Sequence, residues 1–200
     1  MKAIRLVITL VSVLVTGSAI ALIRLAARRV VMPGTVKTVT VHTSSTDTVT
    51  FTATPDTLRA GIFGLWAISH DGHLIVGDVV KESESEVQRK IVRAFGCPLA
   101  DGEKAEFRRD LYRNPAELGL DYSELDIPTP LGSSPAWLIP GSDTLPWVIH
   151  LHGMRTERRV VLPTVKSAAT AELTSLVPSW RGDGEGPVVQ GNASTLGQDE

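Results

Sequence analysis

Apolar and polar residues alternate in the stretch that follows residue 36, "VKTVTVHTSSTDTVTFTAT". Val39 and Val41 fall on one face of a strand, and Val49 and Phe51 do the same further along. This period of two, together with the β-branched residues, predicts two strands joined by the polar loop "HTSSTD". A second pair, "LWAIS" and "LIVGDVV", flanks "HDGH", whose Asp-Gly dipeptide favours a tight hairpin turn.

The pattern between these pairs and residue 126 is less regular. The charged stretch "KESESEVQRKIVRAF" predicts either a solvated strand or a short helix. "NPAELGL" predicts one helical turn, with Asn114 as the N-cap, Pro115 at the first position and Gly119 at the end. We therefore expect residues 30–126 to form a small β-rich accessory region.

Strand and helix patterns mix from residue 127 onward. "IPTPLGSSPAWLIPGSD" predicts strands broken by Pro-Gly turns, and the apolar residues 147–151 predict a further strand. A helix is expected within "TERRVVLPTVKSAATAEL", a short strand in "TSLVPSW", and a glycine-rich loop after residue 181. This order is typical of an α/β sheet with residues 147–151 as an interior parallel strand. Such a sheet is incomplete here, so we also expect an exposed apolar edge and aggregation or partial disorder after residue ~180.

An uncharged, mostly apolar run occupies residues 6–23 near the N-terminus. At about 1.5 Å per residue, a helix of this length approaches the ~30 Å hydrocarbon core of a bilayer. The run predicts a single-pass transmembrane anchor at residues 1–29, with residues 6–27 in contact with lipid. A cleaved signal peptide is the alternative. Basic residues flank the run on both sides, so the orientation of the anchor stays open.

The composition narrows the choice of partners and cofactors. A net charge of −2 and a hydrophobic fraction of 42% give no indication of nucleic-acid binding. Cys97 is the single cysteine, so no internal disulfide is possible, and we expect its side chain to be a small buried hydrophobe. No CxxC or Cys/His ligand spacing is present, which predicts no metal site and no cofactor. His70 and His73 flank the Asp-Gly pair, and a polar hairpin turn is a better interpretation of them than a metal-binding pair.

The segment "WVIHLHGMR", the helix after it, and then "LTSLVPSWRGDGEGP" resemble the α/β-hydrolase fold family, in particular bacterial membrane-anchored α/β-hydrolases. The resemblance implies that residues 127–200 form a partial α/β-hydrolase core. It also implies that His152 and Gly153 form the turn beside the active site, with the backbone N–H of Met154 as an oxyanion-hole donor. In the family a glycine usually ends the first helix, where this chain has Glu172, and the next strand carries no proline, whereas this one contains Pro178.

The catalytic residues of that family are missing from this chain. It has no G-x-S-x-G nucleophile elbow, and no histidine follows His152, although the family order is serine, acid, histidine. The resemblance therefore implies the N-terminal portion of a hydrolase acting on a small ester or amide through an acyl-enzyme, shortened by truncation or by degradation of its gene. We expect the chain itself to be inactive on p-nitrophenyl acetate. The alternative is a non-catalytic, membrane-tethered β module that binds a partner at the cell envelope.

Overall fold

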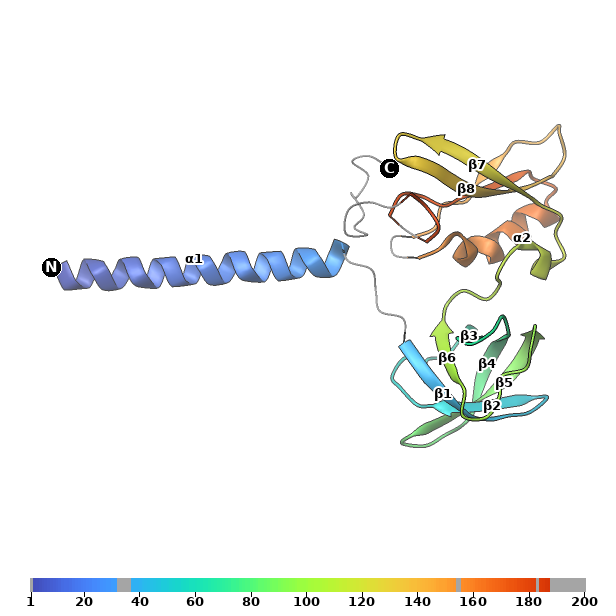
Figure 1. The fold of residues 1–200 in the computed structure, drawn as a ribbon, viewed down its shortest axis with the longest axis horizontal. Coiled ribbons are helices and arrows are strands. Elements are labelled where there is room, and N and C mark those ends of the chain that lie inside the picture. Colours follow the sequence, from blue (N-terminus) through green and yellow to red (C-terminus); the bar gives the residue numbers. More distant parts are fainter. Residues whose placement is uncertain (1, 32–36, 154–155, 183, 188–200) are drawn as a thin grey trace.

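The chain folds into a long helix, a closed barrel of strands and a mixed sheet with a covering helix (Figure 1). The structure is a computed structural model that describes residues 2–31, 37–153, 156–182 and 184–187. The predicted domain division at residues 29 and 126 stays a prediction.

The N-terminal helix, α1 (Lys2–Val31), does not support the predicted membrane anchor. Among the described residues, no helix combines the length and the apolar character that crossing a bilayer requires. The side chains described for α1 run from Val13 to Ala27, and Thr16, Ser18 and Arg24 interrupt that stretch. The single-pass anchor at residues 1–29 is therefore wrong, and the predicted lipid contact of residues 6–27 depended on it.

Six strands close into an antiparallel barrel in the order β1-β2-β5-β4-β3-β6. The barrel closes because β1 pairs with both β2 and β6. Its strands are β1 (Lys37–Ser44), β2 (Thr48–Thr52), β3 (Phe63–Ala67), β4 (His73–Glu82), β5 (Glu86–Phe95) and β6 (Lys104–Arg108).

The alternation seen in the sequence builds the core of this barrel. Val39, Val41, Val49 and Phe51 all point inward and are almost completely buried, as their spacing predicted. The β3–β4 hairpin around Asp71 is also confirmed. The ambiguous charged stretch is the strand β5, which pairs with both β2 and β4.

Arg89 is a charged side chain in the middle of β5, and it is fully buried. Its guanidinium donates four hydrogen bonds to backbone carbonyls, at 2.6 Å to Gly77 and at 2.8–3.1 Å to Thr57, Arg59 and Gly61. These bonds fix the loop between β2 and β3 against β4. A buried cation is tolerated here because its donors have acceptors.

The second sheet has four strands in the order β7-β8-β10-β9. β8 (Gly132–Ile139) pairs in antiparallel fashion with both β7 (Ser123–Thr129) and β10 (Ser175–Pro178), and β9 (Val148–Ile149) pairs with β10 in parallel. The helices around this sheet are η1 (Pro115–Leu118), η2 (Arg158–Val161) and α2 (Leu162–Thr170). Gly119 ends η1 in the left-handed conformation as expected, although the Asn114 side chain makes no capping bond.

These findings contradict the α/β-hydrolase resemblance and the α/β fold class. The described chain is mostly β, with a closed six-stranded barrel that is foreign to the predicted architecture and only two α-helices. Residues 147–151 were expected to form an interior parallel strand, but β9 has two residues and lies at the edge of its sheet. A His-Gly pair after an apolar run is a local pattern, and it does not determine which strands surround it.

Pro178 and Glu172, the two residues that differ from the α/β-hydrolase pattern, each have a structural explanation. Pro178 ends β10 opposite Ala136, beyond the residues that β9 pairs with, so its missing N–H removes no bond to β9. Glu172 adopts φ 56° where the chain turns after α2, a left-handed conformation that favours glycine. The turn also passes close to Gly141, where an added Cβ would lie 2.4 Å from the Glu172 carbonyl oxygen.

Candidate functional site

The segment from Trp147 to Gly153 has two opposite faces. The side chains of Trp147, Ile149 and Leu151 are exposed to 61%, 61% and 58%, whereas His150 and His152 are buried. This alternation follows from extended backbone, in which successive side chains point to opposite sides. One face of the segment is therefore a row of solvent-exposed apolar side chains, and the side chains of the other face anchor the segment to the protein.

His150 anchors the segment through a chain of hydrogen bonds. Its Nδ1 lies 3.2 Å from the Thr164 hydroxyl and its Nε2 lies 3.1 Å from the Ser175 hydroxyl. Thr164 donates its own proton to the Val161 carbonyl at 2.7 Å, so its oxygen accepts from Nδ1–H and Ser175 donates to Nε2. Burial lowers the pKa of His150, which favours this neutral form.

The Ser175–His150 pair has the donor order of a nucleophile and its base, but it is a structural link. Ser175 is fully buried inside the sheet, so its hydroxyl has no access to a substrate. The partner on the other ring nitrogen is a hydroxyl rather than a carboxylate, and it would not stabilise an imidazolium. The three side chains join β9, α2 and β10.

His152 holds the loop that follows β10. The Trp180 indole N–H donates to His152 Nδ1 at 3.1 Å, and the two rings meet edge to face with centroids 5.2 Å apart. The same Nδ1 lies 3.1 Å from the Gly153 carbonyl oxygen, so this nitrogen contacts both the Trp180 loop and the turn that follows His152. His152 was predicted to orient an oxyanion loop, and in the structure it orients Trp180.

The predicted oxyanion turn of His152, Gly153 and Met154 stays a prediction. Met154, whose backbone N–H was the expected donor, lies outside the described residues. Gly153 accepts hydrogen bonds at its carbonyl from the Thr156 backbone N–H, at 3.2 Å, and from the Thr156 hydroxyl, at 2.5 Å. A Cβ at Gly153 would meet only the Thr156 hydroxyl, at 3.9 Å, so packing does not require glycine there.

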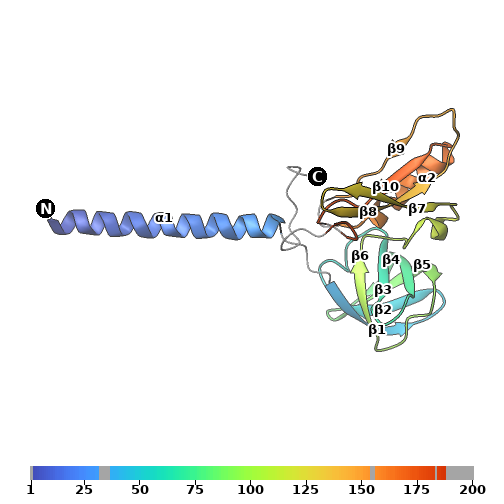
Figure 2. The same cartoon turned by 45° about the horizontal axis from the view of Figure 1, so that its top comes forward.

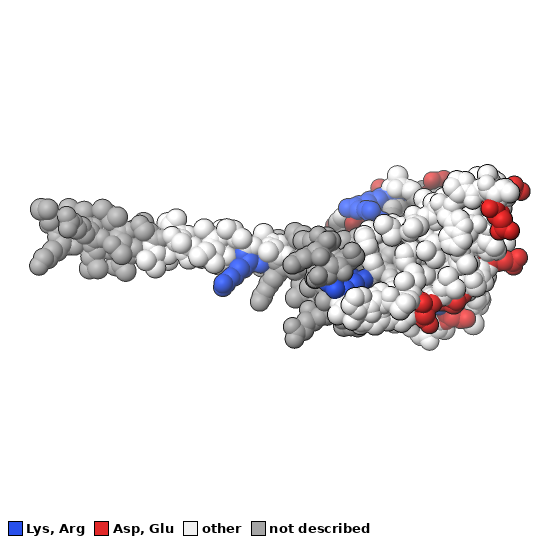
Figure 3. All heavy atoms as spheres, turned by 90° about the horizontal axis from the view of Figure 1, so that it is seen from above, with Lys and Arg blue, Asp and Glu red and all other residues white. Residues whose placement is uncertain are grey.

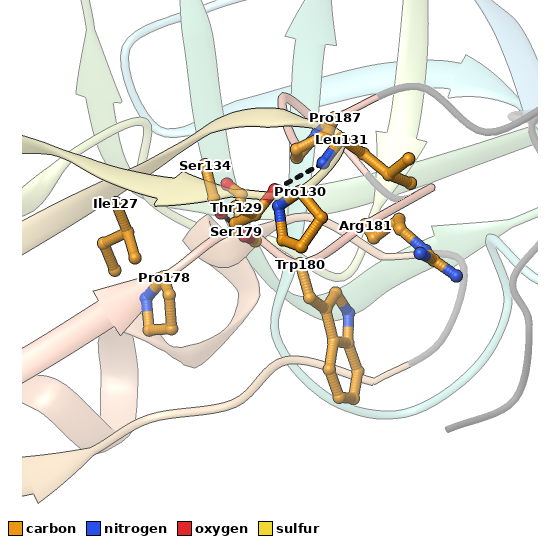
Figure 4. A pocket seen from close by; sticks show the side chains of 10 residues that line it. All are labelled: Ile127, Thr129, Pro130, Leu131, Ser134, Pro178, Ser179, Trp180, Arg181 and Pro187. Carbon is orange, nitrogen blue, oxygen red and sulfur yellow. Dashed lines mark hydrogen bonds between the residues drawn. The ribbon is translucent and has the colours of Figure 1, made fainter. Parts of the chain in front are cut away.

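Trp180 also forms part of the wall of a cavity of about 540 Å³ (Figure 4). The cavity lies between the β7–β8 turn and the loop after β10. Its walls are mostly apolar, and two polar residues are tied to backbone carbonyls, Thr129 to Gly132 and Ser134 to Ser179. A volume and lining of this kind suit a small apolar ligand. The lining residues are Ile127, Thr129, Pro130, Leu131, Ser134, Pro178, Ser179, Trp180, Arg181 and Pro187.

β9 lies at one edge of the mixed sheet, and no other described strand covers it there (Figure 2). Val148 and His150 donate their backbone N–H groups to Thr174 and Leu176, at 2.8 and 2.9 Å. Because backbone groups alternate sides along a strand, the N–H and C=O of Ile149 face away from β10. Among the described strands, β9 pairs only with β10.

The two histidines of the β3–β4 hairpin do not come together as a pair. His73 is fully buried between the rings of Trp66 and Phe95, with centroids 3.9 and 4.7 Å away. Burial, and then the positive charge of Arg113, lowers the pKa of His73 to about 4, so this ring is neutral. His70 instead lies near Asp71 and Cys97, and Cys97 is exposed rather than buried as the sequence had suggested.

Comparisons with known proteins assign no activity to these features. A family model described as "Domain of unknown function (DUF8805)" matches residues 27–108, the part of the chain that contains the barrel strands. No curated protein and no solved structure matches the chain.

Proposed function

We propose that this chain is a binding module that receives an extended, apolar segment of another polypeptide at the open edge of β9. The observation that carries the proposal is the row formed by Trp147, Ile149 and Leu151, which are all more than half exposed beside an unpaired strand edge. An added strand would satisfy the edge through its backbone and cover the row with its side chains, which is the recognition mode called β-augmentation.

The two edges of the same sheet differ in a way that favours this choice. β7 carries Glu124, Asp126 and Pro128, and charges and prolines of this kind prevent a strand from pairing with another chain. Residues 147–151 contain no Asp, Glu, Lys, Arg or Pro, and the one titratable side chain, His150, is buried on the other face. One edge of the sheet is therefore protected and the other is not.

The surface around the mixed sheet is consistent with an uncharged partner. The face seen in Figure 3 has a broad area without Lys, Arg, Asp or Glu, and charged atoms lie mainly toward its periphery. An apolar strand would meet little charge that needs to remain hydrated.

A second copy of the chain is a poorer occupant than an extended segment. Three exposed side chains of this size offer on the order of 300–400 Å² of apolar area. Stable dimers bury about 800 Å² on each partner, so a symmetric pairing of β9 with β9 would be too small.

The anchored face of the segment makes the edge suitable for docking. His150 is bonded to both α2 and β10, and His152 is bonded to Trp180. Rigid presentation of an edge lowers the conformational entropy that binding would otherwise cost.

The test uses a library of displayed ten-residue peptides selected against the full chain. We expect the recovered peptides to carry apolar residues at alternate positions. Their affinity should fall at least tenfold in the variant Ile149→Lys, which places a charge on the edge. The matched control is Val92→Lys on the barrel, because Val92 is exposed to a similar degree, 57%.

Val92→Lys should leave peptide affinity within twofold of the unmodified chain. Recovery of peptides whose binding is the same in the Ile149→Lys variant and the control would refute the proposal. So would selection of charged sequences without alternation.

A second candidate function is favoured by the cavity beside Trp180, which has the size of a small-molecule site. The neutral fluorescent probe N-phenyl-1-naphthylamine should bind there and lose at least tenfold in affinity in Leu131→Asp. Leu125→Asp on β7 and Ile149→Lys on β9 are the controls. A signal that Ile149→Lys abolishes and Leu131→Asp spares would assign the probe to β9 and reject the cavity.

A further inference from the structure

Three side chains of the kinds that bind transition metals meet at one end of the barrel. They are the imidazole of His70, the carboxylate of Asp71 and the thiol of Cys97, and one ligand atom from each lies within 4.8 Å of the other two. The first two belong to the β3–β4 turn, and Cys97 follows β5. The pairing of His73 with Phe95 brings these distant segments side by side.

The backbone holds the two segments in close contact. An added Cβ at Gly72 would lie 1.9 Å from the Cys97 carbonyl oxygen, so only glycine allows this approach. Gly96, which precedes the cysteine, has φ +63°, a conformation that also favours glycine. The three ligand groups are therefore placed by backbone packing rather than by flexible loops.

The ring of His70 is oriented as metal-binding histidines usually are. Its Nε2 lies 3.0 Å from the Glu103 carboxylate, which also accepts hydrogen bonds from the Ser69 hydroxyl and the Ala100 backbone N–H. A carboxylate on one ring nitrogen fixes the proton there and leaves the lone pair on the other. That other nitrogen, Nδ1, accepts a hydrogen bond from the Gly72 N–H at 2.9 Å.

We propose that His70 Nδ1, the Asp71 carboxylate and the Cys97 thiolate bind one divalent cation of the zinc type. Nitrogen, oxygen and sulfur ligands together suit Zn²⁺, which takes four ligands in a tetrahedron, and water would fill the fourth position. Magnesium and calcium prefer oxygen alone, so this ligand set disfavours them.

Binding requires two local changes. The Cys97 thiol loses its proton to solvent as the sulfur–metal bond forms, so each cation bound through this group releases one proton. The Gly72 N–H gives up its hydrogen bond to Nδ1, because the metal takes the same lone pair. Asp71 and Cys97 are exposed, but Gly72 is buried, so the loss of its hydrogen bond is a cost that the metal–nitrogen bond must offset.

The site escaped prediction because its ligands share no spacing motif. The His70–His73 pair drew attention in the sequence, but His73 is buried between Trp66 and Phe95 on the outer face of the barrel, and Cys97 takes its place beside His70. Cys97 was expected to be buried, which hid its capacity to act as a ligand.

The test titrates Zn²⁺ and Co²⁺ into the full chain after treatment with a chelator. We expect one equivalent to bind, and Co²⁺ should give a thiolate charge-transfer absorption in the near ultraviolet. Cys97→Ser and Asp71→Asn should each weaken Zn²⁺ binding at least tenfold, and Cys97→Ser should also abolish that absorption. Asp143→Asn, a change at an exposed aspartate in the mixed sheet region, is the matched control and should bind like the unmodified chain.

Glu103 is a positioning residue in this proposal. Glu103→Gln keeps a hydrogen-bond acceptor but removes the charge, and it should weaken Zn²⁺ binding by about tenfold while retaining the Co²⁺ absorption. Circular dichroism of each variant verifies folding. Binding that is absent in the unmodified chain, or that is equally strong in folded Cys97→Ser, would overturn the proposal.

Discussion

The barrel and the mixed sheet differ in whether they leave strand edges unpaired. Each barrel strand pairs on both sides, so the closed ring β1-β2-β5-β4-β3-β6 leaves no edge. The mixed sheet ends in two edges, one protected by charges and a proline on β7 and one bare on β9. The barrel is complete in itself, whereas the mixed sheet presents a surface that another strand can complete.

The two regions also differ in how they use buried polar groups. In the barrel Arg89 fastens a loop, and in the mixed sheet His150 and His152 fasten the inner face of an exposed segment. Ion pairs connect the regions, with Arg108 3.5 Å from Glu157 and Arg159 3.4 Å from Asp110. Arg89 stabilises the barrel itself, whereas His150 and His152 also shape the proposed docking edge.

The largest effect is expected in the barrel, from Arg89→Met. The change leaves four carbonyl groups without their donor, and we expect the free energy of unfolding to fall by about 4 kcal/mol. Arg93→Met on the same strand is the control, because Arg93 is exposed and lies over the ring of Phe95 without bonds to a described loop. Urea denaturation measures both, and a loss below about 1 kcal/mol for Arg89→Met would show that the barrel does not depend on this residue.

A smaller loss is expected in the mixed sheet, from Gly141→Ala. The new Cβ would lie 2.4 Å from backbone atoms of residues 172–174, and we expect a loss of about 2 kcal/mol as the turn shifts. Gly153→Ala, which has open space, should change stability by less than about 0.5 kcal/mol. Equal effects of the two substitutions in thermal unfolding would contradict this packing of the turn.

An effect of opposite sign is expected from Glu172→Gly. Glu172 has φ 56°, and glycine adopts that conformation without the steric cost that other residues carry, so we expect a gain of about 1 kcal/mol. Ala171→Gly, one residue earlier and at negative φ, should not stabilise the chain. A loss of stability in Glu172→Gly would mean that the turn has another conformation.

The smallest expected effect concerns pH. Burial lowers the pKa of His150 in the folded chain, so below the ordinary histidine pKa of about 6.5 the unfolded chain binds more protons than the folded one. Stability should therefore fall as the pH drops below that value, and His150→Gln should reduce this slope. His42→Gln on the barrel surface is the control. The same slope of stability against pH in the unmodified chain, His150→Gln and His42→Gln would show that His150 does not contribute to the pH dependence.

The sequence was a good guide to the barrel strands and a poor one to the mixed sheet. Alternation at Val39–Val41 and Val49–Phe51 and the Asp-Gly turn are local signals, and the structure follows them. Closure of the barrel depends on the pairing of β1 with β6, which no local pattern displays. The charged appearance of β5 likewise gave no sign that Arg89 is buried.

The failure at the mixed sheet has a definable physical origin. The His-Gly pair and the apolar run before it suggested an interior strand, but strand order depends on long-range pairing. The expectation of an open apolar edge rested on the incomplete α/β sheet and not on residues 147–151, which were expected to be interior. The exposure of Trp147, Ile149 and Leu151 was therefore not predicted. No feature of the sequence indicated that the buried His152 side chain contacts Trp180, because the two residues are 28 positions apart.

The most direct test of the open edge is amide hydrogen exchange, measured by NMR on the two residues of β9 and on His150, which follows it. In the free chain the N–H groups of Val148 and His150 bond to β10, so we expect them to exchange at least tenfold more slowly than the N–H of Ile149. Addition of a peptide selected on the chain should slow exchange at Ile149 to the level of its neighbours. Equal protection of all three amides in the free monomeric chain would contradict the account, because the edge would then already be occupied.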